Sequence, residues 1–233
     1  METYEVLQEA GFKFNARFGQ LIGRNLISNP IVAVSELVKN SYDADADDIK
    51  VIFENLKSGI SSLRIIDDGE GMSLTDLTDK WMMVGSDNKL RNTYTPKGRR
   101  KLGEKGIGRF SVERLAAKLT LRTTQKGNPF ALMISINWDE YDKIGGEFSD
   151  VKHQIIKVPD NPDSCGTELL LTDLRDVWNE TALINLRKEL NLIRPIDINK
   201  VSYKKYEFPG ANIEINLIAQ DYKTRSGEIN PAF

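Results

Sequence analysis

Three polar residues, Glu36, Asn40 and Asp43, follow one another at spacings of four and three positions. On an α-helix these spacings place the side chains within about 60° of one another, on one polar stripe. A carboxylate in such a stripe can orient or deprotonate a water molecule, and an amide oxygen can bind Mg²⁺, which prefers oxygen ligands. Taken alone, the stripe is explained more simply as a solvated helix face.

A second group is the acidic, glycine-rich segment IDDGEGM at residues 66–72. Its two glycines permit tight turns near a ligand. Asp67 follows an apolar run and could accept a hydrogen bond from an exocyclic amine such as N6 of adenine. The segment lacks the spacing and the distal glutamate of a Ca²⁺-binding loop. Taken alone, an acidic turn between a strand and a helix is again the simpler explanation.

A third group is the glycine-rich segment GEKGIG at residues 103–108, which opens a predicted helix. Glycines followed by a helix N-terminus present backbone N–H groups to a phosphate. The spacing matches neither the Walker A loop nor the dinucleotide-binding fingerprint, so a flexible loop with a solvated basic run remains the alternative. The basic residues around the segment are Lys97, Arg99, Arg100, Lys101, Lys105 and Arg109. Further along the chain, the Thr167 hydroxyl could hydrogen-bond a base.

The composition excludes several classes of protein. The chain has 233 residues, with 40% hydrophobic and 28% charged side chains, which favours a packed globular core. The net charge of −2 does not indicate a uniformly basic nucleic-acid binder. A single cysteine, Cys165, and a single histidine, His153, exclude an intrachain disulfide and a Cys/His zinc site. We expect a structural or surface role for His153, and Cys165 to be a small residue beside a turn. We also expect a cytoplasmic location. No membrane span is expected, because no apolar run approaches about 18 residues.

The elements that must position these groups follow from periodicity and punctuation. The pattern mixes adjacent strands with helices, which predicts an α+β two-layer sandwich. Asn29 and Pro30 begin the first helix, and Ser73 caps the second, with Asp76 as a poor capping-box partner. A long polar loop covers residues 84–105. We expect helices over residues 31–44, 73–81, 107–118 and 179–192, and strands over 47–53, 63–67, 119–124, 130–138, 153–158, 167–172 and 212–218.

Four segments in this order, ELVKNSYDA, IDDGEGM, GEKGIGRF and GTELLL, resemble the signature of the GHKL ATPase superfamily. That superfamily includes DNA gyrase, the ninety-kilodalton heat-shock chaperone, histidine kinases, MutL and the MORC ATPases. The resemblance extends from about residue 29 to residue 172. It implies the Bergerat fold, in which helices cover one face of a mostly antiparallel sheet and ATP binds between the two layers under a mobile lid.

The resemblance also implies roles for individual residues. Glu36 matches the general base that activates water, and Asn40 matches the Mg²⁺ ligand that also touches the phosphates. Asp43 matches a supporting aspartate on the same helix. Asp67 matches the aspartate that recognises adenine, and Thr167 matches the threonine near the adenine edge.

The remaining implied site residues surround the nucleotide. Gly69 and Gly71 shape the turn after Asp67, and Met72 is an apolar wall of the base pocket. The lid covers about residues 84–105, and Lys89 within it resembles a phosphate-approaching lysine of MORC-like proteins. The implied phosphate-binding residues at the end of the lid are Lys105, Gly106, Ile107, Gly108 and Arg109.

We therefore expect Mg²⁺-dependent binding and slow hydrolysis of ATP that drives homodimerisation of a larger clamp-like or chaperone-like protein. A protein client or DNA would be contacted through other domains. The expected divisions are an ATP-binding domain at residues 1–175 and the start of a transducer-type domain at 176–233, so the chain is expected to be the front part of a longer protein. A catalytic lysine from a following domain is expected, so activity of this chain alone should be weak.

Two alternatives stay open: a non-catalytic ATP-sensing module, and a histidine-kinase catalytic domain. The nearest subfamilies by resemblance are the MORC-like, heat-shock-chaperone-like and MutL-like ATPases. The GFRGEAL motif of MutL is absent, and Arg109 stands where the chaperones carry an aromatic residue.

Overall fold

The computed structural model describes residues 5–11, 13–14, 29–57, 61–84, 93–102, 110–143, 151–193 and 214–219. Within these residues, one open sheet has eight strands in the order β1-β8-β7-β6-β9-β4-β3-β10. All neighbours are antiparallel except β10 and β3, which run parallel at one edge. The strands are β1 (Glu5–Ala10), β3 (Asp48–Glu54), β4 (Ser62–Asp67), β6 (Ala116–Thr124), β7 (Phe130–Asn137), β8 (His153–Pro159), β9 (Gly166–Leu174) and β10 (Glu214–Ala219). The short strands β2 (Lys13–Phe14) and β5 (Met83–Val84) pair separately.

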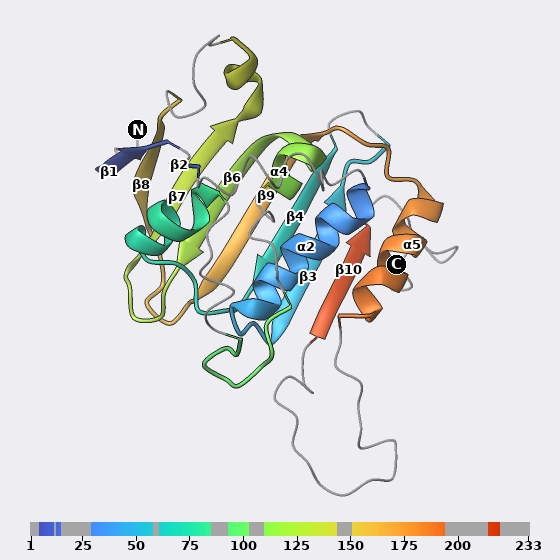
Figure 1. Ribbon diagram of the computed structural model, residues 1–233, viewed down its shortest axis with the longest axis horizontal. Helices are drawn as coiled ribbons and strands as arrows, with labels where there is room; N and C mark the ends of the chain where they lie inside the picture. Colours follow the sequence, from blue (N-terminus) through green and yellow to red (C-terminus); the bar gives the residue numbers. More distant parts are fainter. Residues whose placement is uncertain are drawn as a thin grey trace, which may run out of the picture.

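The three α-helices of the described residues lie together on one face of this sheet (Figure 1). The central helix α2 (Pro30–Asp43) packs against both α4 (Phe110–Leu115) and α5 (Glu180–Asn191). One cluster of buried apolar side chains joins the helices to the sheet. The predicted α+β two-layer sandwich is therefore confirmed. The helix α5 and the strand β10 belong to the same layers, and the expectation that residues 176–233 begin a further domain stays a prediction.

The helix α2 begins where its sequence predicts. The Asn29 side chain accepts a hydrogen bond from the Ile31 amide (2.9 Å), and Pro30 occupies the first turn, where its missing N–H has no helical acceptor to lose. The predicted polar stripe is half-buried, whereas the face toward the sheet is fully covered. The buried residues of α2 are Ala33, Val34, Ser35, Leu37, Val38, Ser41 and Tyr42.

The register of the central strands aligns three polar residues. Asp67 ends β4 and lies opposite Thr167 of β9, which in turn lies opposite Thr123 of β6. Directly opposed residues of neighbouring strands project from the same face of a sheet. A carboxylate and two hydroxyls therefore meet at one end of the sheet, below the C-terminal end of α2.

Two expectations about local structure are wrong. The helix expected over residues 107–118 ends at Leu115, and the chain continues directly into β6 at Ala116. Pairing of β6 with β9 begins there, at Ala116 opposite Leu174, and this long-range ladder outweighs the local helix pattern. Residues 107–109 lie outside the described residues.

The second correction concerns Asp76, which is an effective capping partner. The Ser73 hydroxyl donates to the Asp76 carboxylate (2.6 Å) and accepts from the Asp76 amide (3.1 Å), while the Ser73 amide also donates to that carboxylate (3.1 Å). This reciprocal arrangement begins the predicted helical segment at residue 74, whose last part is a wide turn, η1 (Asp76–Trp81).

The other predicted strands and the helix at 179–192 are found within two residues of their expected bounds. Trp138 leaves the predicted strand and opens a short 3₁₀ helix, η2 (Trp138–Lys143). Of the structural and surface positions expected for His153, the structure has the first: the residue is buried in β8, and its Nε2 lies 2.6 Å from the Tyr141 hydroxyl. In the part of the chain that the structure describes, no helix is long and apolar enough to cross a membrane.

Candidate functional site

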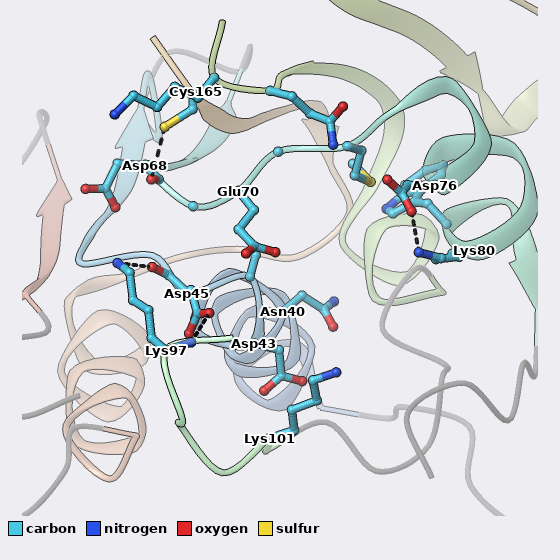
Figure 2. Close-up of a pocket in the computed structure, with 17 residues that line it drawn as sticks. Asn40, Asp43, Asp45, Asp68, Glu70, Asp76, Lys80, Lys97, Lys101 and Cys165 are labelled. Atoms are coloured by element: carbon cyan, nitrogen blue, oxygen red, sulfur yellow. Dashed lines mark hydrogen bonds and ion pairs between the residues drawn. The ribbon is translucent and has the colours of Figure 1, made fainter. Parts of the chain in front are cut away.

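A cavity of about 750 Å³ opens beside the C-terminal end of α2 (Figure 2). Its walls are the last turn of α2, the loop 68–72 after β4, the segment η1, the turn between β6 and β7, and residues of the segment 93–102. A volume of this size is typical of sites that enclose a small ligand or cofactor. The chargeable side chains that line it are Asp43, Asp45, Asp68, Glu70, Asp76, Lys80, Lys97, Lys101, Lys126 and Cys165.

The buried carboxylate of Asp67 does not itself line this cavity, but it is hydrogen-bonded to Gly69, which does. Its Oδ2 accepts from the Ser41 hydroxyl (2.7 Å), and its Oδ1 accepts from the backbone amides of Gly69 and Thr167 (3.1 Å each). Burial raises the pKa of Asp67, and these three hydrogen bonds oppose that rise. A carboxylate has about four acceptor positions, so the three donors leave one for a ligand.

Glycine is required at two positions of the loop after Asp67. Gly71 has φ +66°, and a Cβ there would lie 2.0 Å from the Thr124 carbonyl oxygen. At Gly69 a Cβ would lie 2.6 Å from the carbonyl oxygen of Ala44. The loop therefore lies directly on α2 and β6, and Met72 is held beside the cavity by a hydrogen bond from its amide to a β6 hydroxyl.

The three residues of the polar stripe occupy different environments. Asn40 and Asp43 line the cavity, and their side chains extend toward it from the last turns of α2 (Figure 2). Glu36 is not among the lining residues of the described part. Its carboxylate accepts a hydrogen bond from the Lys39 ammonium at 2.8 Å, and both side chains are about three-quarters buried.

The segment 93–102, the described part of the predicted lid, folds as a hairpin that docks on the end of α2. Tyr94 and Arg100 form an antiparallel bridge. The amide of Leu102 donates to the Asp43 carboxylate at 2.8 Å, so the end of this hairpin is bonded to the polar stripe itself. This contact gives Asp43 a structural partner that the resemblance alone does not indicate.

A second set of contacts, the latch, holds the middle of the hairpin. We use this name for Asp45, Asp47, Thr95, Lys97 and Arg99. The Asp45 carboxylate, buried just after α2, accepts from the Thr95 hydroxyl and from the Lys97 amide, and lies 3.8 Å from Arg99 Nε. The Arg99 guanidinium is also buried and donates to the Asp47 carboxylate.

Two further contacts complete the latch. Arg99 also donates to the Ala46 carbonyl and lies over the Tyr42 ring, at 5.6 Å from its centroid. The Lys97 ammonium donates to the Asp45 carbonyl (2.9 Å) and to the Asp47 carboxylate (2.7 Å). The hydrogen bonds from Lys97 and Arg99 hold the pKa of Asp47 below its usual range, although partial burial opposes them.

The side of the cavity formed by η1 contains groups that sequence reasoning did not identify. Lys80 pairs with Asp76, and the half-buried Trp81 ring lines the wall beyond them. Burial alone would raise the pKa of Asp76, but the hydrogen bonds from Lys80 and Ser73 hold it below its usual value. Cys165, expected to be only a small residue beside a turn, also lines the cavity.

Of the predicted site residues, Asn40, Asp43, Gly69, Gly71 and Met72 line the cavity. Asp67 and Thr167 do not line it, but they are hydrogen-bonded to each other and, through Asp67, to Gly69. Six predicted site residues lie outside the described residues: Lys89, Lys105, Gly106, Ile107, Gly108 and Arg109. Among the described residues, no group of three or more His, Cys, Asp or Glu side chains is arranged to hold a metal ion.

Comparison with known proteins agrees with this geometry. The family described as "Histidine kinase-, DNA gyrase B-, and HSP90-like ATPase" matches residues 27–167. Over 188 residues the chain is 30% identical to "DNA mismatch repair protein MutL" of Clostridium beijerinckii, which covers 78% of this chain and 26% of the relative. It is 28% identical over 177 residues to the MutL of Clostridium acetobutylicum, covering 72% of this chain and 28% of the relative.

A further relative is "Putative type II restriction enzyme HgiDII" of Herpetosiphon aurantiacus, 26% identical over 130 residues, or 55% of this chain and 20% of the relative. The chain thus spans roughly a quarter of the length of these relatives. Of the subfamilies that the sequence resembles, MutL is the one that these relatives support. The family match covers more than half of the chain, and the matched residues include the buried aspartate, its glycine loop and the polar stripe. The chain therefore belongs to the histidine kinase-, DNA gyrase B- and HSP90-like ATPases, as an ATP-binding domain similar to that of MutL.

Proposed function

We propose that this chain binds Mg²⁺–ATP in the cavity beside α2 and hydrolyses it slowly, with Glu36 as the general base. The observation that carries the proposal is the Asp67 carboxylate, which is buried directly behind the cavity-lining loop of Gly69 and held by three donors. Its remaining acceptor position suits the amino group of adenine. The Thr167 hydroxyl, 3.1 Å from that of Thr123, is the second polar group for the base edge.

The other end of the nucleotide is proposed to lie along α2. Asn40 extends into the cavity one helical turn before Asp43 and would supply the protein oxygen of a Mg²⁺ site. Mg²⁺ usually keeps several waters and is held by one or two protein oxygens together with phosphates, so a site of this kind needs no cluster of carboxylates. The ion would neutralise charge that develops on the phosphates.

Glu36 lies one further turn back along the stripe, on the side where the terminal phosphate would be. Lys39 occupies only its Oε1, so Oε2 has the position to orient a water molecule and accept its proton. Because both residues are only partly exposed, we expect the pair to fix the Glu36 rotamer rather than to abolish its function as a base.

The relatives support a wider context. Two kinds of relative, a mismatch repair protein and a putative restriction enzyme, carry names that refer to DNA. We infer that this domain is part of a larger protein that acts on DNA, in which ATP binding drives homodimerisation. A chaperone-like or MORC-like role is less well supported, because the relatives named above are of neither kind.

The test is a single-turnover assay with γ-labelled ATP, Mg²⁺ and excess protein. The wild-type chain is expected to release phosphate, and Glu36→Ala is expected to bind ATP equally well but to release phosphate at least 100-fold more slowly. Glu180→Ala, an exposed position in the first turn of α5, is the matched control and should behave as the wild type.

Equal rates for Glu36→Ala and the wild type would show that Glu36 is not the base. Binding without any turnover by the wild type would favour the ATP-sensing module instead. Transfer of the labelled phosphate to a histidine of another protein would favour the histidine-kinase alternative. Failure of Asp67→Asn to weaken ATP binding would refute the proposed placement of adenine.

A further inference from the structure

The basic residues of the predicted lid do not form one uniform phosphate-binding surface. Arg99 is 3% exposed and is committed to Asp45, Asp47 and the Ala46 carbonyl. The Lys97 ammonium lines the cavity but donates to two oxygens of the same acidic segment. The cationic groups of both residues are therefore already paired with carboxylates that follow α2.

Lys101 differs from these two residues. It lines the same cavity and is half-buried, but within the part of the chain that the structure describes its ammonium makes no hydrogen bond or ion pair. Its backbone is fixed on both sides, because its own amide donates to the Thr93 carbonyl (2.9 Å) and the next amide, of Leu102, donates to Asp43 (2.8 Å).

Figure 2 shows Lys101 beside Asp43 at the end of the cavity where Asn40 also extends. A lysine whose backbone is bonded in place, but whose ammonium forms no ion pair with a described residue, is prepared to bind an anion that enters the cavity. Lys126, in the turn between β6 and β7, also lines the cavity; it is exposed, and no hydrogen bond fixes its backbone among the described residues.

We propose that Lys101 binds the polyphosphate of the nucleotide and that the latch positions it for this contact. The inference rests on the proposed nucleotide-binding function and adds one binding residue to it. Lys97 and Arg99 are then positioning residues, which hold the hairpin but do not touch the phosphates. The side chain of Lys101 is expected to approach the phosphates from the hairpin side, opposite the loop that contains Gly69 and Gly71.

The test compares the affinities of ATP, ADP and adenosine for the wild type, Lys101→Ala and Lys101→Arg by isothermal titration calorimetry. Lys101→Ala should weaken ATP binding about tenfold, the effect of one charge-assisted hydrogen bond at a partly solvated site, and adenosine binding less than twofold. Lys101→Arg should restore most of the ATP affinity. The salt dependence of ATP binding should also become shallower in Lys101→Ala.

Two matched variants remove the same charge elsewhere. Lys118 of β6 forms an exposed ion pair with Asp173 of β9, and Lys118→Ala should leave all three affinities unchanged. Lys126→Ala tests the opposite wall of the cavity. A loss of ATP affinity in Lys126→Ala but not in Lys101→Ala would overturn the proposal and place the phosphates at that wall.

Equal loss of ATP and adenosine affinity in Lys101→Ala would also overturn it, because the residue would then support the cavity rather than bind phosphate. If the wild type binds neither ATP nor adenosine, the proposed function itself fails, and the inference fails with it. These outcomes are distinguishable, since in the other cases the wild type binds ATP with measurable affinity.

Discussion

Asp45 and Asp173 provide a paired test of the latch. Both are non-glycine residues in the left-handed region, with φ values of 60° and 59°. The Asp45 side chain is 1% exposed and belongs to the latch, whereas the Asp173 side chain is 46% exposed and pairs only with Lys118 at 2.8 Å. Replacing either residue with glycine relieves the same backbone strain and adds the same flexibility to the unfolded chain. The difference between the two variants therefore isolates the carboxylate contacts.

The magnitude follows from those contacts. At Asp173, relief of about 1 kcal/mol of left-handed strain is offset by unfolded-state entropy and by loss of a surface pair that contributes about 0.5 kcal/mol. The net change should be close to zero. At Asp45, the Thr95 hydroxyl and the Lys97 amide lose a charged acceptor, at about 1.5 kcal/mol each. Arg99 also loses one of its two carboxylates. We expect Asp45→Gly to destabilise the chain by about 3 kcal/mol more than Asp173→Gly.

The assay is urea unfolding of the 233-residue chain, combined with hydrogen exchange of the native state. Loss of the latch should first appear locally. The amides of Thr95, Gly98 and Lys101, which are bonded within the hairpin, should exchange at least 30-fold faster in Asp45→Gly, while amides of β6 and β9 respond only to global stability.

The reasoning would be refuted by a difference below about 1 kcal/mol between the two glycine variants, because buried hydrogen bonds to a charged acceptor cannot contribute so little. It would also be refuted by unchanged exchange in the hairpin. A loss of stability without faster exchange of the hairpin amides would mean that Asp45 stabilises the turn after α2 rather than the hairpin.

Two other predictions follow from the same geometry. Although partial burial opposes it, hydrogen bonding to Thr124 and Arg122 holds the pKa of Asp160 at about 2. The folded pKa lies below the unfolded value, so this stabilisation is present above pH 4 and is lost as the pH falls from about 4 to 2. Between these two pH values, the free energy of unfolding, measured by urea titration, should fall by about 1 kcal/mol less in Asp160→Asn than in the wild type. Of the three tryptophans, Trp81 lines the cavity while the other two are buried, so ATP should change the intrinsic fluorescence of the wild type but not that of Trp81→Phe.

The parts of the site that the sequence predicts are those specified locally. The stripe of Glu36, Asn40 and Asp43 follows from helical period and from the cap at Asn29, both of which lie within one short segment. Asp67 could be placed because a strand end and two glycines adjoin it. These features depend on backbone geometry over a few residues, so the sequence contains the information needed to find them.

The latch could not be predicted in this way. Asp45 and Arg99 are 54 positions apart, and one aspartate in an acidic run after a helix resembles any solvated turn residue. The basic run could be read only as a set of like charges, because no local pattern tells which guanidinium will be buried. The prediction that the helix continues beyond Leu115 was wrong for the same reason, since the pairing of β6 with β9 is a long-range interaction.

The charges of the latch decide how the hairpin acts on an anionic ligand. Lys97 and Arg99 carry two positive charges, and Asp45 and Asp47 carry two negative charges within hydrogen-bonding or ion-pair distance. The four charges largely cancel, so of the two hairpin lysines that line the cavity, Lys97 and Lys101, only Lys101 has a charge that the latch does not compensate. Removing the Asp45 carboxylate makes the cavity less negative, which by charge alone would favour ATP. Because the same change releases the hairpin that holds Lys101, we expect ATP affinity in Asp45→Gly to fall rather than rise.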